Sequence, residues 1–168
     1  MDNQELRRMC SALRDGDREA FQALYEDLSA PVYTVLVRLT GDRASAEDLL
    51  QETFLKLYRS PPGPEVERPR AWVFAVARNL ALDYLRARRS AVSLEDAEPP
   101  APQDGADLRL DVEAALARLS PEDRILVTLR LNGGLKFREA ARLLGLPLGT
   151  ALRRYHAAIG RVRDYLNG

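Results

Sequence analysis

The sequence is poor in the residues from which many catalytic and metal centres are built. Among 168 residues there is one cysteine, Cys10, and one histidine, His156. A single cysteine excludes a disulfide within the chain and a thiolate metal cluster. A nucleophilic pair of Cys10 with His156 is formally possible, but the first falls in a short polar helix and the second in a basic one. We therefore expect no enzyme, no metal site and no cofactor.

Long apolar segments are also missing. No apolar run approaches the roughly 20 residues that span a bilayer, and the first ten residues, MDNQELRRMC, contain no apolar signal segment. We expect a protein that stays in the cytoplasm without membrane insertion. Apolar residues still make up 46% of the chain, which is enough to form buried cores. The length allows one ordinary domain or two small ones.

The formal net charge is zero, but the charges are segregated along the chain. Basic and acidic residues number 8 and 11 in residues 1–60, 6 and 3 in 61–93, 2 and 9 in 94–123, and 9 and 2 in 124–168. Phosphate binding follows local rather than overall charge, so the two basic segments are compatible with two separate DNA-contacting surfaces.

The segment from Arg70 to Arg89, RAWVFAVARNLALDYLRARR, combines an apolar helix face with a basic one. Apolar residues from Trp72 to Tyr84 recur at steps of three and four, the period of an amphipathic helix. The other face carries groups that suit phosphates and base edges, namely Arg78, Asn79, Asp83, Arg86, Arg88 and Arg89. Most basic helix faces are merely solvated, so the pattern alone leaves both interpretations open.

Helical periodicity also predicts earlier helices at residues 3–14, 18–28, 29–39 and 44–58. The helix over 44–58 should bury Leu50, Phe54, Leu57 and Tyr58. Its second face is acidic and polar, with Asp48, Gln51 and Glu52. By its pattern alone that face is a solvated flank, whose early carboxylates favour the helix N-terminus.

The rest of the chain predicts a linker and a second helical domain. Residues 90–107 are rich in proline and acidic residues and poor in apolar ones, as in a flexible linker. Helices follow at 108–119, from Pro121, at 137–144 and up to about residue 166, the last two forming a helix-turn-helix pattern. The predicted fold is all-α, with a domain over 1–90, a flexible acidic linker over 91–107 and a domain over 108–168.

Three long segments resemble one protein family. AWVFAVARNLALDYLRARR resembles the promoter-melting helix of bacterial RNA polymerase sigma factors of the extracytoplasmic-function (ECF) type, and SAEDLLQETFLKLYR resembles their polymerase-docking helix. The stretch from Leu119 to Leu166 resembles the family's second DNA-binding domain. The resemblance implies a sigma factor that binds core RNA polymerase and directs promoter recognition and melting in transcription initiation.

The resemblance also assigns partners and residues. Asp48, Gln51 and Glu52 would contact the clamp helices of the largest polymerase subunit, and the flap of the second-largest subunit and an anti-sigma factor would be further partners. Promoter DNA would be contacted by the six polar residues from Arg78 to Arg89 and, in the last helix, by Thr150, Arg153 and Arg154. The loop of residues 60–68, SPPGPEVER, is a plain connector by composition, whereas the resemblance makes it a pocket for a flipped-out base.

The C-terminal domain departs from the family pattern. Lys136 stands where the family has a capping Ser or Thr, and Leu152, Ala157 and Ile159 stand where it has basic residues. Phosphate contact by the last helix is still expected, and the apolar residues suggest contact with a protein as an alternative. Two other functions stay open, an ordinary helix-turn-helix regulator of duplex operators and a sigma-like decoy that does not read promoters.

Overall fold

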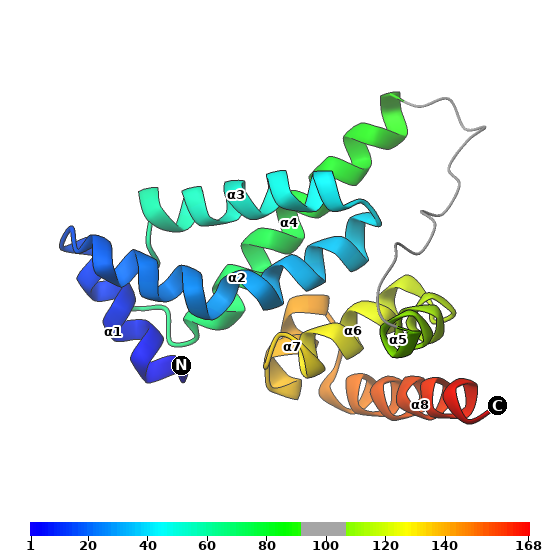
Figure 1. The fold of residues 1–168 in the computed structure, drawn as a ribbon. Helices are drawn as coiled ribbons and strands as arrows, with labels where there is room; N and C mark the ends of the chain where they lie inside the picture. Colours follow the sequence, from blue (N-terminus) through cyan, green and yellow to red (C-terminus); the bar gives the residue numbers. More distant parts are fainter. Residues whose placement is uncertain (92–106) are drawn as a thin grey trace. The chain divides into compact units, whose positions relative to one another are not determined.

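The structure is a computed structural model that describes residues 1–91 and 107–168. Every regular element in these residues is an α-helix, which confirms the all-α prediction (Figure 1). The helices are α1 (Asn3–Arg14), α2 (Arg18–Thr40), α3 (Arg43–Arg59), α4 (Pro69–Ala91), α5 (Asp107–Ala117), α6 (Pro121–Leu131), α7 (Phe137–Leu144) and α8 (Leu148–Asn167). Apart from its first and last residues, the predicted linker lies outside the described residues.

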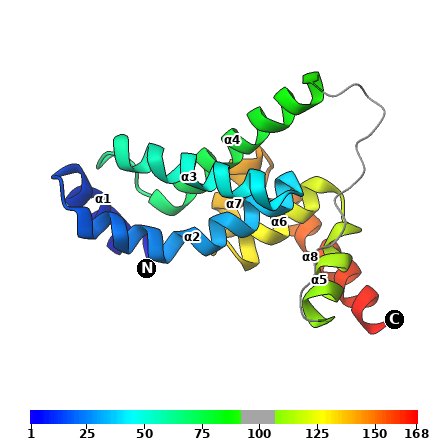
Figure 2. The same ribbon diagram turned by 45° about the horizontal axis from the view of Figure 1, so that its top comes forward.

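The chain forms two compact units, Met1–Ala97 and Glu98–Gly168. In the first unit α2 packs against α1, α3 and α4, and α4 also packs against α1 and α3. The long helices α2 and α3 run alongside one another (Figures 1 and 2). The fully buried core of this unit includes Leu6, Leu24, Leu28, Leu36, Leu57 and Phe74.

Aspartates cap the first three helices. Asp2 accepts a hydrogen bond from the backbone N–H of Glu5, and the Glu5 side chain accepts one from the N–H of Asp2 in return. Asp17 and Asp42 accept in the same way at the starts of α2 and α3. Each cap satisfies a backbone donor that has no partner within the helix, so these starts follow from local sequence.

The expected break between helices at residues 28 and 29 is wrong, because α2 continues to Thr40 with Pro31 inside it. A proline within a helix removes one backbone hydrogen bond. The buried stripe nevertheless passes through Pro31 without interruption, from Leu28 to Val32 and Val35. Burial of apolar side chains on both sides of the proline stabilises the continuous helix.

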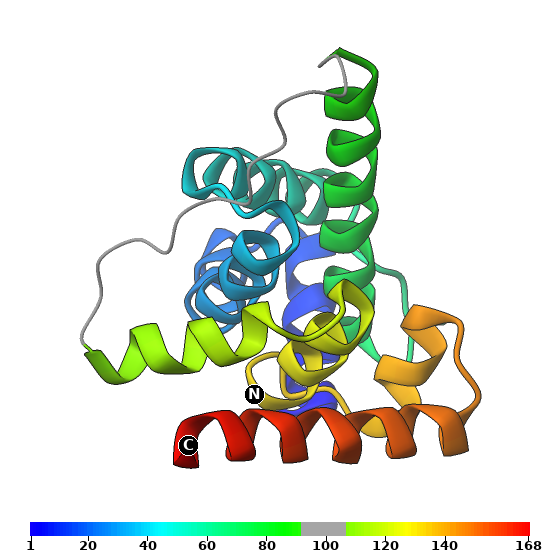
Figure 3. The same ribbon diagram turned by 90° about the vertical axis from the view of Figure 1, so that its right-hand side faces the viewer.

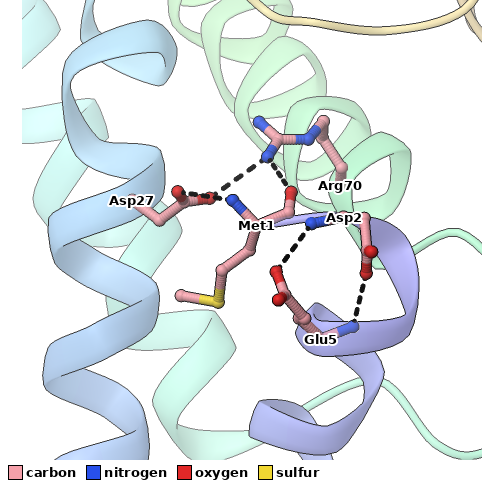
Figure 4. A network of polar contacts seen from close by, with 5 residues as sticks. All are labelled: Met1, Asp2, Glu5, Asp27 and Arg70. Carbon is pink, nitrogen blue, oxygen red and sulfur yellow. Dashed lines mark hydrogen bonds and ion pairs between the residues drawn. The ribbon is translucent and has the colours of Figure 1, made fainter.

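Arg70 ties the first turn of α4 to α2 and to Met1, which precedes α1 (Figure 4). Its Nη2 atom donates to the carbonyl oxygen of Met1 at 2.8 Å and to Oδ2 of Asp27 at 3.1 Å. Arg70 and Asp27 are both largely buried, with 16% and 24% of their side chains exposed. This ion pair holds the start of α4 beside α2.

In the second unit α8 packs against α5, α6 and α7. Figure 3 shows α5 and α8 lying side by side. Ser120 caps α6 by accepting from the N–H of Asp123 at 3.2 Å, as the Ser-Pro-Glu-Asp pattern predicts. Gly145 ends α7 in the left-handed region at φ 69°, and the short turn after it leads into α8. These two helices form the predicted helix-turn-helix.

Candidate functional site

The predicted docking residues share one exposed face of α3. Asp48, Gln51 and Glu52 are all exposed, and Leu55 on the same face exposes 44% of its surface. A large apolar residue one turn beyond Glu52 is not needed for solvation. This face therefore offers an apolar contact one turn from the negative charge of Glu52, which suits a partner helix that combines basic and apolar side chains.

The opposite face of α3 differs in part from the prediction. Phe54 and Leu57 are buried as expected, but Leu50 is half-buried and Leu49 takes its place in the core. Tyr58 is 46% exposed rather than buried. Its ring packs edge-on against Phe21, with centroids 5.2 Å apart. Tyr58 therefore follows the spacing of the core residues because it makes an aromatic contact at the surface.

A hydrogen-bonded chain joins the start of α3 to α4. Ser45 lies against the carboxylate of Asp42, and its Oγ is 2.7 Å from the hydroxyl oxygen of Tyr84. The hydrogen bond from Ser45 lowers the pKa of Asp42 below its ordinary value, with help from the N–H groups of Ala44 and Ser45 and the charge of Arg88. The docking helix and the basic helix are thus in direct polar contact.

The outward face of α4 carries the predicted DNA-contacting residues. Arg78 is half-buried, while Asn79, Asp83, Arg86, Arg88 and Arg89 are exposed. Asp83 and Arg86 form an ion pair at 3.4 Å with more than 70% of each side chain exposed. An exposed pair of this kind adds little stability, so both side chains remain available to a ligand. Phe74, within the apolar stretch from Trp72 to Tyr84, is fully buried and anchors the inner face.

Arg154 on α8 is part of an intramolecular ion-pair network. Its Nε donates to Oδ1 of Asp123 at 2.8 Å, and its Nη1 is 3.0 Å from Oε2 of Glu122. The hydrogen bond with Glu122, followed by that with Asp123, raises the pKa of Arg154. Arg161 also approaches Asp123, at 3.9 Å. The charge that the sequence analysis assigned to DNA is therefore largely balanced within the domain.

The other predicted residues of α8 are exposed or half-buried. Arg153 is exposed and donates to Oγ1 of Thr150 at 3.3 Å. Ala157 is exposed and Leu152 is half-buried. Ile159 packs against the core cluster that includes Leu116, Leu119, Val127 and Ala158. Its apolar character is accounted for by this core, without a protein partner.

The structure also shows the surroundings of three residues singled out in the sequence, Lys136, Cys10 and His156. The Lys136 side chain does not cap α7, but its backbone N–H donates to Oε1 of Glu139 at 3.3 Å. Cys10 is buried, and burial raises the pKa of its thiol, so it is not an activated nucleophile. His156 packs against Tyr155, with ring centroids 5.6 Å apart.

Two absences apply to the described part of the chain. Residues 1–91 and 107–168 contain no group of three or more His, Cys, Asp or Glu side chains that could hold a metal ion. None of the helices in these same ranges combines the length and apolar character that a membrane crossing requires.

Comparison with known proteins identifies two matching families. Residues 24–91 match the family described as Sigma-70 region 2, and residues 109–162 match Sigma-70, region 4. The first match contains the α3 and α4 surfaces, and the second contains the helix-turn-helix.

Similar proteins extend the comparison along the chain. The ECF RNA polymerase sigma factor SigL of Mycobacterium tuberculosis is 35% identical over 152 residues, which cover 84% of this chain and 86% of SigL. The ECF RNA polymerase sigma factor SigE of Mycolicibacterium smegmatis is 36% identical over 147 residues, and the match covers 80% of this chain but only 57% of SigE. The structure of the sigma factor RpoE with the anti-sigma factor NepR from Bartonella quintana is similar with a TM-score of 0.68 and 26% identity, covering 88% of this chain and 96% of that one.

Proposed function

This chain belongs to the ECF family of RNA polymerase sigma factors, and we propose that it binds core RNA polymerase through α3 and opens promoter DNA through α4. The observation that carries the proposal is the pairing of these two surfaces within one compact unit. The acidic face with Asp48 and Glu52 is directly followed, after a short loop, by the basic face from Arg78 to Arg89.

The docking step uses charge and apolar contact together. Asp48, Gln51 and Glu52 offer acceptors for basic side chains, and Leu55 offers an apolar anchor one turn further along the helix. Truncation of apolar anchors inside a polar rim often costs most of an interface's binding energy. We infer that the clamp helices of the largest polymerase subunit contact this face.

The melting step uses the outward face of α4. Asn79 has an amide that can pair with a base edge once the strands separate, and Arg86, Arg88 and Arg89 can neutralise phosphates of the opened strand. The loop of residues 60–68 joins the two surfaces and is suited to hold a base outside the stack. The fold supplies these contacts without any covalent chemistry.

Further partners belong to the same proposal. Thr150 and Arg153 on α8 would contact upstream promoter DNA. Arg154 would contribute less to DNA binding, because its charge is already paired with Asp123 and Glu122. The flap of the second-largest polymerase subunit would contact the C-terminal unit. An anti-sigma factor is proposed because RpoE, a similar protein, was solved in complex with one. All of these interactions would take place in the cytoplasm.

Reconstituted transcription tests the proposal. Core polymerase with the full chain should start transcription at selected members of a random promoter library, and permanganate should detect strand opening there. Asn79→Ala should reduce opening more than it reduces polymerase binding, with Gln22→Ala on an exposed face of α2 as a control. An operator-binding regulator would instead bind duplex tightly without polymerase, and a decoy would bind polymerase without opening any promoter.

A further inference from the structure

The ion pairs of Arg154 have a buried part and an exposed part. Asp123 accepts a hydrogen bond from Nε of Arg154 at 2.8 Å, and only 11% of the Asp123 side chain is exposed. Glu122 lies 3.0 Å from Nη1 of the same guanidinium, but 76% of its side chain is exposed. The contact with Asp123 therefore belongs to the packing of α6 against α8, whereas Glu122 meets the guanidinium at the surface.

Glu122 is not required to begin α6 or to hold α8 in place. Ser120 caps α6 by accepting from the N–H of Asp123, and a carboxylate in the first turn adds only a modest interaction with the helix dipole. Buried residues such as Ala158 and the Asp123 ion pair hold α8. Because an exposed ion pair contributes little to stability, the main effect of Glu122 is on the charge that Arg154 presents to a ligand.

The charges around Arg154 cancel. Asp123 is also approached by Arg161, whose Nη1 lies 3.9 Å from its Oδ2. The cluster thus contains two carboxylates and two guanidiniums. Arg154 nevertheless follows directly after the exposed Arg153 in the N-terminal half of α8, and 30% of its side chain is exposed. A DNA phosphate that approaches this guanidinium must therefore compete with Glu122.

We propose that Glu122 weakens the sequence-independent binding of the helix-turn-helix to duplex DNA by holding the guanidinium of Arg154. The inference rests on the proposed function and concerns its upstream DNA contact. Phosphate contacts carry no sequence information, and each cation that reaches a phosphate strengthens binding to every duplex. Glu122 thus shortens the residence of the C-terminal unit on any duplex, since affinity differences within one interface arise mainly in dissociation.

The decisive comparison is a double-mutant cycle. Glu122→Gln removes the charge of the carboxylate and leaves the Asp123 contact in place. It is combined with Arg154→Gln, which removes the guanidinium, and thermal unfolding shows whether each variant is folded. Asp111→Asn is the matched control, because it makes the same charge change at an exposed position of α5 in the same unit.

The measurement is the affinity of holoenzyme for a duplex that ends before the opened region, with either the promoter sequence or a shuffled one. Glu122→Gln should raise both affinities by about two- to fivefold, the fold-change that matches the strength of an exposed ion pair. The slope of log affinity against log salt should steepen by up to about 0.9. Neither effect should appear in the Arg154→Gln background or with Asp111→Asn. If Arg154→Gln does not fold, the salt slopes of Glu122→Gln and Asp111→Asn decide the question.

The outcomes that contradict this role are distinct from failure of the proposed function. Equal effects of Glu122→Gln in the two backgrounds, or of Glu122→Gln and Asp111→Asn, would mean that the carboxylate does not act through Arg154. A gain confined to the promoter sequence would also overturn the inference, because Arg154 would then read a base. A wild-type holoenzyme that opens no promoter in the permanganate assay would instead overturn the proposed function, while coupling in the cycle would still support the role of Glu122.

Discussion

The hydroxyl oxygens of Ser45 and Tyr84 lie 2.7 Å apart, although the two residues are 39 positions apart in the sequence. Ser45 has one hydroxyl proton, and the Asp42 carboxylate beside it can only accept. Tyr84 is therefore the donor to Ser45, and the chain of hydrogen bonds ends on the negative charge of Asp42. This contact joins the helix proposed to bind polymerase to the helix proposed to open DNA.

Tyr84→Phe removes this contact without changing the size of the ring. We expect the free energy of unfolding to fall by about 1 kcal/mol, the net value of one hydrogen bond. Promoter opening should fall as well, because α4 loses a contact that orients it against α3. Thermal unfolding and permanganate footprinting measure the two effects. Tyr33→Phe on α2 is the control, and equal losses in both variants would mean that the contact has no special role.

The stability contributed by the Asp42 cap should depend on pH. Its pKa is lowered in the folded chain, chiefly by the hydrogen bond from Ser45, so the charged form is favoured by folding. Its contribution is therefore complete above the ordinary carboxyl pKa of about 4 and is lost as pH falls through the lower folded value. Asp42→Ala should cost about 1 kcal/mol at pH 7. The difference from wild type should shrink below pH 4, and a constant difference would contradict the assignment.

Charge reversal on α3 tests docking. Asp48→Lys combined with Glu52→Lys should weaken binding to core polymerase at least tenfold, while circular dichroism stays unchanged because both residues are exposed. Glu19→Lys with Glu26→Lys makes the same charge change on exposed positions of α2 and should have a small effect. Undiminished binding in a pull-down with the α3 variant would show that polymerase contacts another face.

Leu55→Ser tests the apolar part of the same face. Leu55 is 44% exposed, so the substitution should change stability by less than about 0.5 kcal/mol. If Leu55 is the anchor of the interface, polymerase affinity should fall by about 30-fold, equivalent to about 2 kcal/mol. Leu131→Ser is the control, because Leu131 is even more exposed, at 61%, and lies in the second unit. Similar effects of the two substitutions would rule out Leu55 as an anchor.

The last helix offers two positions with opposite expected responses. Ala157 is exposed, so Ala157→Arg should be tolerated and should steepen the salt dependence of upstream DNA binding by up to about 0.9. Ile159 packs on the core, so Ile159→Arg should lower the free energy of unfolding by about 2 kcal/mol or more. Thermal unfolding and DNA binding by holoenzyme check both variants. A stable Ile159→Arg protein with improved DNA binding would place residue 159 at the DNA surface instead.

The sequence by itself determined the features that depend on neighbouring residues. Helix starts after Asp17 and Ser120 were predictable because a capping side chain bonds a backbone N–H two or three positions away, and Asp42 caps α3 by the same local contact. The exposed face with Asp48 and Glu52 was predictable for the same reason, since helical periodicity alone separates it from Leu57. Family resemblance then supplied roles that no local pattern contains.

Only the tertiary structure decided the contacts between distant positions. Helix α2 passes through Pro31 because apolar burial on both sides outweighs the lost hydrogen bond. Arg154 binds Asp123, which is 31 positions away, although its sequence context is that of a DNA-facing residue. Arg7 and Arg14 meet the carbonyls of the loop only because α1 packs beside it. Such pairings depend on how helices pack, and the period of a single helix does not contain that information.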